Sequence, residues 1–355
     1  MSRIAILGAG AWGTALAINL ANRQGDVGGV SAGGTTAGGA AGGGRHAVTL
    51  WTRSASAAAA MREQRENSTY LPGFRLPEDV TITADAAESV AGAEIVVSVV
   101  PSEHVRDIYE LFGSHLSDGQ LLVSATKGLE DGTLLRMSEV IGEVTARFGL
   151  RMAVGVLSGP SFAQEVAAGS PTALTIASSD SGLAGRVQRE FSGATLRLYT
   201  NDDVVGVELG GALKNVIAIA SGVVAGLGLG HNTAAALITR GIAETTRLAL
   251  ACGGRRETLA GLSGIGDLVL TCTGSLSRNR LVGIELGKGR HLEEILAGLK
   301  GKVAEGVRTT HAALGLAVKH GIEMPITAQM GMILEERKSP VEAMRELMAR
   351  PGRDE

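Results

Sequence analysis

Aromatic residues and cysteines are both scarce in this chain. Phe, Trp and Tyr make up 3% of its 355 residues, so the core must come from Ala, Val, Leu and Ile, within a hydrophobic content of 45%. The two cysteines, Cys252 and Cys272, are far apart and lack the CxxC spacing typical of zinc sites. We therefore expect no disulfide framework, no metal site and a reducing, cytoplasmic setting.

The chain also lacks an excess of positive charge and a long uninterrupted apolar run. Its net charge is -3, and no basic stretch marks a surface for nucleic acid or anionic membranes. The apolar run at residues 216–230 is too short and too rich in glycine for a membrane span. These absences predict a protein without nucleic-acid binding or stable membrane insertion, whose anion sites are local.

The first 200 residues contain short apolar strands separated by helical patterns, which is typical of a parallel sheet covered on both faces. From about residue 204 onward, helices punctuated by glycine dominate. We predict an α/β Rossmann-type domain with a mostly parallel sheet at residues 1–200 and an all-α domain at residues 201–355. The strand-like runs lie at residues 3–10, 47–51, 80–83, 94–100, 120–126, 152–157 and 172–178.

Residues 25–44 interrupt this pattern, because ten of these twenty residues are glycine. Such a composition cannot bury enough apolar area to offset the entropy lost on ordering. We predict a flexible surface insertion without chemistry.

Gly8, Gly10 and Gly13 form the pattern G-x-G-x-x-G directly after the first predicted strand and at the start of a helix. In this setting the first glycine allows a tight turn, the second admits a pyrophosphate, and the third packs helix on strand. Amides at the helix start would hold the phosphates. The pattern predicts dinucleotide binding, and the alternative is a plain strand-to-helix turn.

The acid that commonly binds the cofactor ribose is missing after the second predicted strand, where the chain reads Thr52-Arg53-Ser54. An arginine at this place can meet a 2′-phosphate, so Arg53 favours NADP over NAD. The alternative is a solvated surface arginine.

Lys214 stands in a segment, residues 206–224, that is otherwise almost entirely apolar or small. A buried, unpaired ammonium is strongly unfavourable. Lys214 therefore either reaches the surface, is neutralised by Glu208, or lies beside a ligand that carries negative charge or a carbonyl. In a helix, Gly210 and Gly211 would share its face. Because glycine is unfavourable there, close approach of a ligand would explain both glycines and favours the third explanation.

Other polar residues could complete a site around Lys214. Lys127 follows a predicted strand, at the sheet edge where α/β proteins bind ligands, although a surface lysine is the alternative. Asp267 and Thr271 are one helical turn apart and could point together, and Asp267 could keep Lys214 charged and oriented. Ser161, which follows a Gly-Pro turn, could belong to an anion nest.

The stretch SRNR supplies a candidate phosphate clamp. Arg278, with Ser277 and Asn279 beside it, has the donors that a phosphate requires. The alternative is a capped helix start with surface charge.

Together these motifs resemble the NAD(P)-dependent glycerol-3-phosphate dehydrogenases of the bacterial type. The resemblance implies reduction of dihydroxyacetone phosphate to sn-glycerol 3-phosphate, which feeds phospholipid synthesis. The matching stretches follow one another along nearly the whole chain: GAGAWGTALA, ATKGLE, SGPSFAQEVAAG, GGALKNVIAIASG, ITRGIAE, GDLVLTCTGSLSRNR, VAEGVRT and EMPI.

The resemblance also implies roles for single residues. Lys214 would donate and accept the proton, with Lys127 near both cofactor and substrate and Asp267 as the third catalytic residue. The other substrate-side positions would be Gly159, Ser161, Ser277, Arg278 and Asn279, to which the spacing from Asp267 adds Thr271. Beside the three glycines and Lys127, the cofactor-side positions would be Ala11, Trp12, Arg53, Ala163, Arg278, Val303 and Glu305.

The chain departs from the family in three places. Ala11 stands where many members carry Ser, which removes one possible donor to the pyrophosphate. Ser161 replaces a common Thr and keeps the hydroxyl. The insertion at residues 25–44 is not typical of the family.

In the implied mechanism the Lys214 ammonium stabilises charge that develops on the ketone oxygen and donates the proton. This requires surroundings that lower its pKa. Two other functions stay open: a related NADP-dependent hydroxy-acid or sugar-phosphate dehydrogenase, and a non-catalytic NADP-sensing protein. Glycine-rich helices favour close packing, between subunits as well, and we expect a homodimer.

Overall fold

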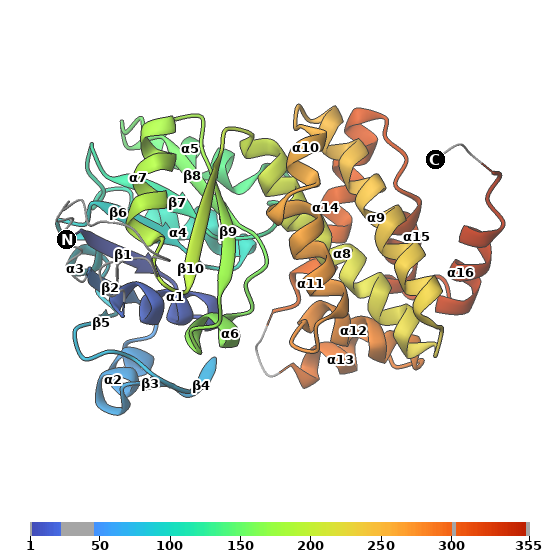
Figure 1. Ribbon diagram of the computed structural model, residues 1–355, viewed down its shortest axis with the longest axis horizontal. Coiled ribbons are helices and arrows are strands. Elements are labelled where there is room, and N and C mark those ends of the chain that lie inside the picture. Colours follow the sequence, from blue (N-terminus) through green and yellow to red (C-terminus); the bar gives the residue numbers. More distant parts are fainter. Residues whose placement is uncertain (1, 23–45, 300–302, 353–355) are drawn as a thin grey trace, which may run out of the picture.

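The structure is a computed structural model that describes residues 2–22, 46–299 and 303–352. A sheet covered by helices forms one part and a group of helices forms the other, and the two lie side by side (Figure 1). The predicted fold class, a Rossmann-type α/β part followed by a helical part, is confirmed. The glycine-rich insertion predicted at residues 25–44 lies outside the described residues.

In the part of the chain that the structure describes, the large sheet has eight strands in the order β10-β9-β8-β7-β6-β1-β2-β5. Neighbouring strands are parallel except β8 and β9, so the prediction of a mostly parallel sheet is confirmed. The strands are β1 (Arg3–Leu7), β2 (Ala47–Trp51), β5 (Thr81–Thr83), β6 (Ile95–Ser98), β7 (Leu121–Ser124), β8 (Val154–Ser158), β9 (Thr172–Ala177) and β10 (Leu196–Asn201).

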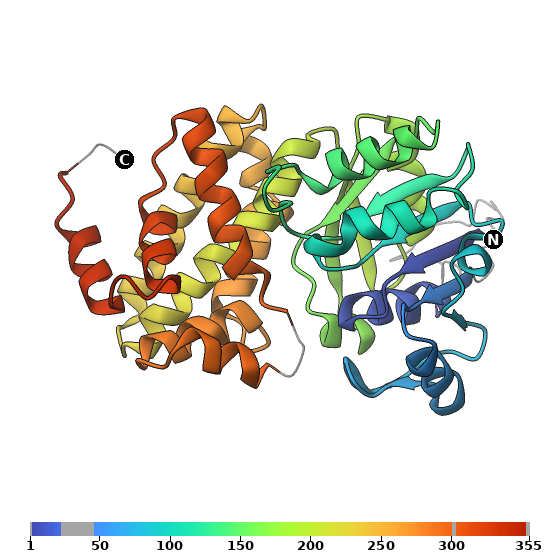
Figure 2. The ribbon, with the colours of Figure 1, turned by 180° about the vertical axis from the view of Figure 1, so that it is seen from behind.

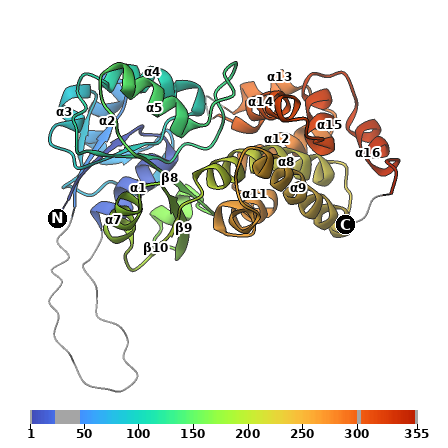
Figure 3. The same cartoon turned by 90° about the horizontal axis from the view of Figure 1, so that it is seen from above.

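Helices cover both faces of this sheet (Figure 3). Ile4 and Ile6 of β1 belong to a core with α1 and α7, whereas Ala5 and Leu7 point to the other face, where α4 and α5 pack. Figure 2 shows α4 and α5, in teal to green, in front of the sheet. The helices are α1 (Ala11–Ala21), α2 (Ala55–Gln64), α3 (Ala86–Val90), η1 (Ser102–His104), α4 (Val105–Phe112), α5 (Met137–Arg147), α6 (Ala163–Ala167) and α7 (Ser181–Phe191).

Strand β10 and the small hairpin of β3 (Glu66–Asn67) and β4 (Leu71–Arg75) were not predicted from the sequence. In β10 buried and exposed residues alternate, because it is an edge strand. A search for continuous apolar runs passes over such a strand.

The helical part is arranged around α8, whose residues are buried from Gly206 to Val224. The helix begins after Asp203, whose side chain caps it by accepting the Gly206 N–H at 2.8 Å. The helices and turns are α8 (Val204–Gly226), α9 (His231–Ala251), α10 (Arg256–Leu259), the π-helical turn η2 (Leu262–Gly266), α11 (Asp267–Thr273), α12 (Arg278–Gly287), α13 (Leu292–Gly298), α14 (Glu305–His320), α15 (Pro325–Leu334) and α16 (Pro340–Met348).

Glycines allow α8 and α12 to pack with their backbones almost in contact. A Cβ on Gly222 would lie 2.1 Å from the Arg280 carbonyl oxygen, and one on Gly283 would lie 1.9 Å from that of Ile219. Neither helix could accept alanine at these positions without moving. The close packing expected from the glycine-rich helices therefore occurs within this chain.

In length and composition α8 would be able to cross a membrane, as would the bent pair Arg256–Thr273 and Arg278–Gly287 if counted as one span. The apolar run at residues 216–230 is by itself too short for a membrane span. The prediction based on that run missed the length of the helix, which begins well before the run and has 23 residues. Of its most apolar window, 89% is buried inside the protein. Such extensive burial is typical of a helix in the core of a folded protein.

Candidate active site

The carboxyl ends of the parallel strands gather the predicted site residues along one edge of the sheet. Chain order reverses between the neighbours β1 and β6, and open α/β sheets bind ligands at such a point. Gly8 follows β1 with a φ of +119°. A Cβ there would lie 2.9 Å from the carbonyl oxygen of Val99, which follows β6. Only glycine suits this turn.

The start of α1 has the features that a bound pyrophosphate requires. The helix begins at Ala11, and Gly10 before it provides no side-chain cap for the first amides. Among the described residues, a Cβ on Gly10 would meet nothing within 4 Å, whereas one on Gly13 would lie 2.0 Å from the Gly8 carbonyl oxygen. The amides and the helix dipole suit the phosphates of a dinucleotide. The residues present therefore fit an NAD(P) cofactor.

Arg53 lies two residues beyond β2, and its side chain is exposed. Since β2 is the parallel neighbour of β1, Arg53 stands at the same edge of the sheet as the glycine turn. The next residue, Ser54, caps α2 by accepting the Ala57 N–H at 3.2 Å. The preference for NADP that Arg53 indicates stays a prediction.

Lys214 is buried and paired. Its side chain donates to Asp267 Oδ1 at 2.5 Å and to Thr271 Oγ1 at 2.9 Å, and the residue is 8% exposed. Lys127 donates to the other oxygen, Asp267 Oδ2, at 2.6 Å and to the Gly159 carbonyl oxygen at 2.9 Å. Two ammonium groups, one from the sheet edge and one from α8, therefore share one carboxylate that is 1% exposed.

Glu208 does not neutralise Lys214, although the two lie on one helix. Its carboxylate accepts hydrogen bonds from Arg136 Nη1 at 2.7 Å, Ser138 N at 2.8 Å and Ser138 Oγ at 2.6 Å. These bonds join α8 to the start of α5. Of the explanations considered for Lys214, the surface position and the pairing with Glu208 are wrong, and Asp267 is its partner.

The glycines before Lys214 have a different cause from the one expected. A Cβ on Gly210 would lie 2.7 Å from the Ser263 carbonyl oxygen, and one on Gly211 would lie 2.6 Å from Ser158 Oγ. Other segments of this chain, and not a ligand, approach α8 at these points. The two glycines therefore do not indicate a ligand, and that inference from the sequence is wrong.

Charge and burial make Lys214 easier to deprotonate than an ordinary lysine. Burial lowers its pKa from 10.5 to about 8; the attraction of Asp267 opposes this shift and the repulsion of Lys127 adds to it. Burial also raises the pKa of Glu305 from 4.5 to about 7, although Arg278, Lys214 and Lys127 all oppose that rise. A lysine with a pKa near 8 can act as either acid or base close to neutral pH.

A single π-helical turn, Leu262–Gly266, leads directly into Asp267. Thr271 lies one turn further along, and its hydroxyl donates to the Asp267 backbone oxygen at 2.6 Å. Asp267 and Thr271 thus lie together, as their spacing indicated. Single π-helical turns of this kind are frequent at functional sites.

The Gly-Pro turn after β8 faces Lys127. Gly159 has a φ of +136°, and its carbonyl oxygen accepts from both Lys127 Nζ and Ser161 Oγ, the latter at 3.1 Å. Ala163 opens α6 two residues later. Ser161 is thus oriented by the same carbonyl that holds Lys127.

The three residues of the candidate phosphate clamp have different surroundings. Ser277 caps α12 by accepting the Arg280 N–H at 3.2 Å, and Arg278 beside it is exposed. Asn279 is buried; it donates to Asn215 Oδ1 at 2.9 Å and accepts the Gly306 N–H at 3.0 Å. The capped helix start is therefore present, and Arg278 is the member of the three whose side chain is exposed.

The start of α14 approaches the site from the helical part. Val303 and Glu305 lie here, and a backbone hydrogen bond from Ser102 of η1 reaches Glu305. Sequence reasoning did not single out Ser102 or Asn215. Ser102 lies outside the quoted motifs, and nothing inside GGALKNVIAIASG distinguishes Asn215, so the contacts between distant segments reveal both residues.

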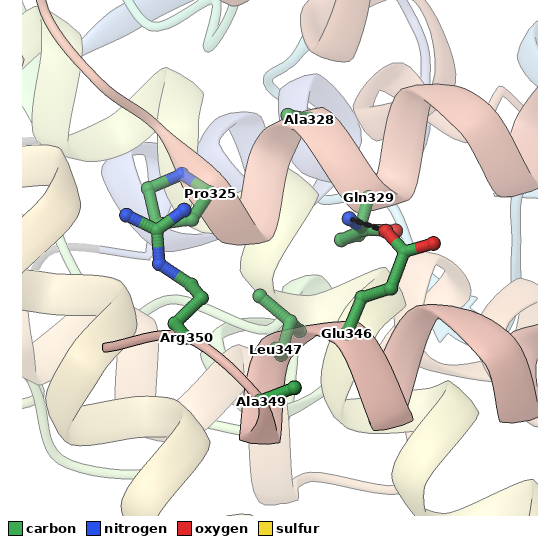
Figure 4. Close-up of a pocket in the computed structure, with 7 residues that line it drawn as sticks. All are labelled: Pro325, Ala328, Gln329, Glu346, Leu347, Ala349 and Arg350. Atoms are coloured by element: carbon green, nitrogen blue, oxygen red, sulfur yellow. Dashed lines mark hydrogen bonds between the residues drawn. The ribbon is translucent and has the colours of Figure 1, made fainter. Parts of the chain in front are cut away.

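A pocket of about 350 Å³ lies elsewhere, between α15 and α16 at the far end of the helical part (Figure 4). Gln329 donates across it to Glu346 Oε2 at 3.0 Å. No predicted site residue lines it. Its lining residues are Pro325, Ala328, Gln329, Glu346, Leu347, Ala349 and Arg350.

The fold and the site define an NAD(P)-binding α/β oxidoreductase with a lysine–aspartate centre. Residues 3–184 match the family described as "NAD-dependent glycerol-3-phosphate dehydrogenase N-terminus", and residues 203–345 match the corresponding "C-terminus" family. The chain belongs to the NAD-dependent glycerol-3-phosphate dehydrogenases, as its motifs indicated.

Similar proteins cover the whole chain. A protein of Acidobacterium capsulatum named glycerol-3-phosphate dehydrogenase [NAD(P)+] is 61% identical over 358 residues, with 100% of both chains covered. One of the same name from Koribacter versatilis is 58% identical and covers 100% of this chain and 99% of its own. The crystal structure of glycerol-3-phosphate dehydrogenase from Coxiella burnetii has a TM-score of 0.88 and 39% identity, covering 98% of this chain and 99% of its own.

Proposed function

We propose that this chain interconverts dihydroxyacetone phosphate and sn-glycerol 3-phosphate with NAD(P)H and supplies the product for phospholipid synthesis. The observation that carries the proposal is the buried Lys214 ammonium, which shares Asp267 with Lys127 at the sheet edge that also bears the dinucleotide turn. Membership of the family supports the substrate, because the relatives are named for it.

When bound, NAD(P)H would supply the hydride. The residues of this chain would manage the charge and the proton. Negative charge that develops on the ketone oxygen is stabilised by the Lys214 ammonium, which then donates its proton to that oxygen. In the reverse direction the neutral amine accepts the proton from the alcohol. The pKa of about 8 makes both forms of Lys214 accessible near neutral pH.

Asp267 and Lys127 prepare Lys214 for this task. Asp267 orients the ammonium through a 2.5 Å hydrogen bond, and Lys127, anchored on the Gly159 carbonyl, contributes the second positive charge. Two ammonium groups and one carboxylate leave a net positive charge that suits an anionic substrate. The exposed Arg278 would bind the substrate phosphate and so hold the ketone in place.

The remaining predicted residues are assigned by position. Residues 1–200 would bind the dinucleotide and residues 201–355 would carry Lys214 and most of the substrate contacts. We favour NADP because Arg53 stands where an acid would select NAD. The other proposed substrate contacts are Gly159, Ser161, Thr271, Ser277 and Asn279, and the cofactor contacts are Gly8, Gly10, Ala11, Trp12, Gly13, Arg53, Lys127, Ala163, Arg278, Val303 and Glu305.

We further propose a cytoplasmic homodimer without membrane insertion. A subunit contact on the helical part would cover large apolar side chains that are exposed there. Light scattering on the purified chain tests the proposal, and a monomer at all concentrations would contradict it. The exposed side chains include Leu250, Val269, Leu276, Leu281 and Val318.

The deciding experiment follows the loss of NADPH absorbance with dihydroxyacetone phosphate, and repeats it with NADH. We expect turnover by the parent chain and a loss of several orders of magnitude in Lys214→Ala, with NADPH binding retained in a fluorescence titration. Turnover of α-keto acids or of other sugar phosphates in place of dihydroxyacetone phosphate would favour a different dehydrogenase. Cofactor binding without any turnover would favour a sensing protein.

A further inference from the structure

Two consecutive glycines lie in the interior of α8, one helical turn before Lys214. Gly210 and Gly211 precede Lys214 by four and three residues, so all three lie on one side of the helix. Glycine inside a helix is unfavourable relative to alanine. Their contacts show what the missing side chains permit.

Gly211 lies against the segment that holds Lys127. A Cβ on Gly211 would lie 2.6 Å from Ser158 Oγ and 3.6 Å from Lys127 Cγ. Ser158 ends β8 directly before Gly159, whose carbonyl oxygen accepts from Lys127 Nζ. An alanine at this position would push the Ser158 hydroxyl or α8 itself out of place, and either movement would disturb the segment on which Lys127 is anchored.

Gly210 lies against the segment that holds Asp267. A Cβ on Gly210 would lie 2.7 Å from the Ser263 carbonyl oxygen, inside the π-helical turn that leads into Asp267. Backbone cannot swing aside as a side chain can, so alanine here would displace the whole turn.

We propose that Gly210 and Gly211 are positioning residues for the reaction, an inference that rests on the proposed function. Without a Cβ, each admits one of the two segments that carry the partners of Lys214. Gly210 sets the approach of Asp267, and Gly211 sets the approach of Lys127. The two glycines together allow one carboxylate to meet both ammonium groups within 2.6 Å.

The two contacts differ in a way that makes the proposal testable. The atom that crowds Gly211 is a side-chain hydroxyl, and Ser158→Ala removes it. The next atoms, Lys127 Cγ at 3.6 Å and Ser158 Cβ at 3.7 Å, are at ordinary contact distance from the new Cβ. Ser158 Oγ finds no hydrogen-bond partner among the described residues, so its removal leaves no other group unsatisfied. The atom that crowds Gly210 belongs to the backbone and cannot be removed.

The experiment compares Gly211→Ala and Gly210→Ala, each alone and combined with Ser158→Ala, with Ser158→Ala as the reference. We expect Gly211→Ala to lower kcat about 10- to 100-fold, because displacements near 1 Å have such effects, with KM for NADPH unchanged. Ser158→Ala should restore the activity of Gly211→Ala to its own level, and should leave Gly210→Ala impaired.

A second readout separates positioning from loss of stability. The pKa of Lys214, followed through its side-chain NMR signal, should rise in Gly211→Ala as Lys127 moves away, and should return in the double variant. This titration needs no turnover, so it tests the positioning even if the parent chain fails to reduce dihydroxyacetone phosphate, which would contradict the proposed function alone. If Gly211→Ala alone fails to fold, the variant that combines Gly211→Ala with Ser158→Ala still tests the proposal.

The proposal is overturned if Gly211→Ala has parental kcat and an unchanged Lys214 pKa. It is equally overturned if the combination of Gly211→Ala with Ser158→Ala stays inactive or unfolded. Restored activity in the combination of Gly210→Ala with Ser158→Ala would also overturn it.

Discussion

Replacing Asp267 by Asn should move the pH dependence of catalysis, and not only lower the rate. Asp267 accepts from Lys214 Nζ at 2.5 Å and attracts its charge, which keeps the pKa of Lys214 from falling further than about 8. Asparagine can still accept a hydrogen bond but carries no charge. Asp267→Asn should therefore lower the pKa of Lys214 below its parental value.

The size of the shift follows from the charge that is lost. Opposite charges about 4 Å apart attract by about 4 kcal/mol at an effective dielectric constant of about 20, which is about 3 pKa units. Because the amide oxygen retains part of the interaction, we expect a fall of about 2 units. At pH near 7.5 the ammonium fraction would then drop on the order of 20-fold, and the rate of ketone reduction with it.

The assay is kcat/KM for dihydroxyacetone phosphate measured from about pH 5 to about pH 9. The falling limb of the profile should move from near pH 8 toward pH 6, and the deficit should shrink as the pH is lowered. A uniform loss of rate with the limb in its parental place would refute the reasoning, since Asp267 would then not set the charge of Lys214.

Glu208→Gln is the matched control. Glu208 is a buried carboxylate on α8 that pairs with the partly buried Arg136, so its replacement also removes the charge of a carboxylate from an ion pair on the same helix. It should lower the thermal unfolding temperature without moving the falling limb. Both variants need a circular dichroism spectrum at the assay temperature to show that they are folded.

Three further predictions concern charge and cofactor. The pKa of Lys214 is lower in the folded chain than in the unfolded chain, so the unfolded chain binds more protons between pH 8 and 10.5. The free energy of unfolding should therefore rise with pH in this range by about 3 kcal/mol. Lys214→Met, measured by urea unfolding, should lack that rise. The pH dependence of stability that Glu305 causes has the opposite sign, because its pKa is raised from 4.5 to about 7 in the folded chain. The free energy of unfolding should fall by at most about 3 kcal/mol as the pH rises through this range, and Glu305→Gln should lack the fall. Arg53→Ser should raise KM for NADPH about 10-fold or more and leave KM for NADH within about twofold; equal effects on both would contradict a 2′-phosphate contact.

The dinucleotide turn could be predicted from the sequence because its cause is local. The φ of +119° at Gly8 and the 2.0 Å approach of a Cβ on Gly13 to the Gly8 carbonyl oxygen both arise within one strand–turn–helix unit, which the three glycine positions alone indicate. The contact of Gly8 with Val99 comes from outside that unit and was not predicted. The alternation of apolar strands and helices likewise predicted the mostly parallel sheet. What failed was β10, where exposed residues alternate with buried ones.

The lysine centre could be predicted only in part. The spacing of Asp267 and Thr271 placed them on one helix face, and the apolar surroundings of Lys214 required a partner for its charge. That Lys127 shares the same carboxylate depends on a contact between residues 140 positions apart, which no local pattern encodes. For the same reason the two glycines before Lys214 suggested a ligand, whereas the segments that approach them belong to the chain itself.

The shared carboxylate also bears on how substrate binding and proton transfer are linked. Lys127 and Lys214 carry two positive charges against the single negative charge of Asp267, so the buried centre is positive before any ligand arrives. A phosphate-bearing substrate would oppose that excess and favour the charged form of Lys214. By linkage, the ammonium form must then bind the substrate more tightly than the amine form. Substrate affinity should therefore weaken as pH rises through the pKa of Lys214, and the substrate itself would promote the protonation state that its reduction requires.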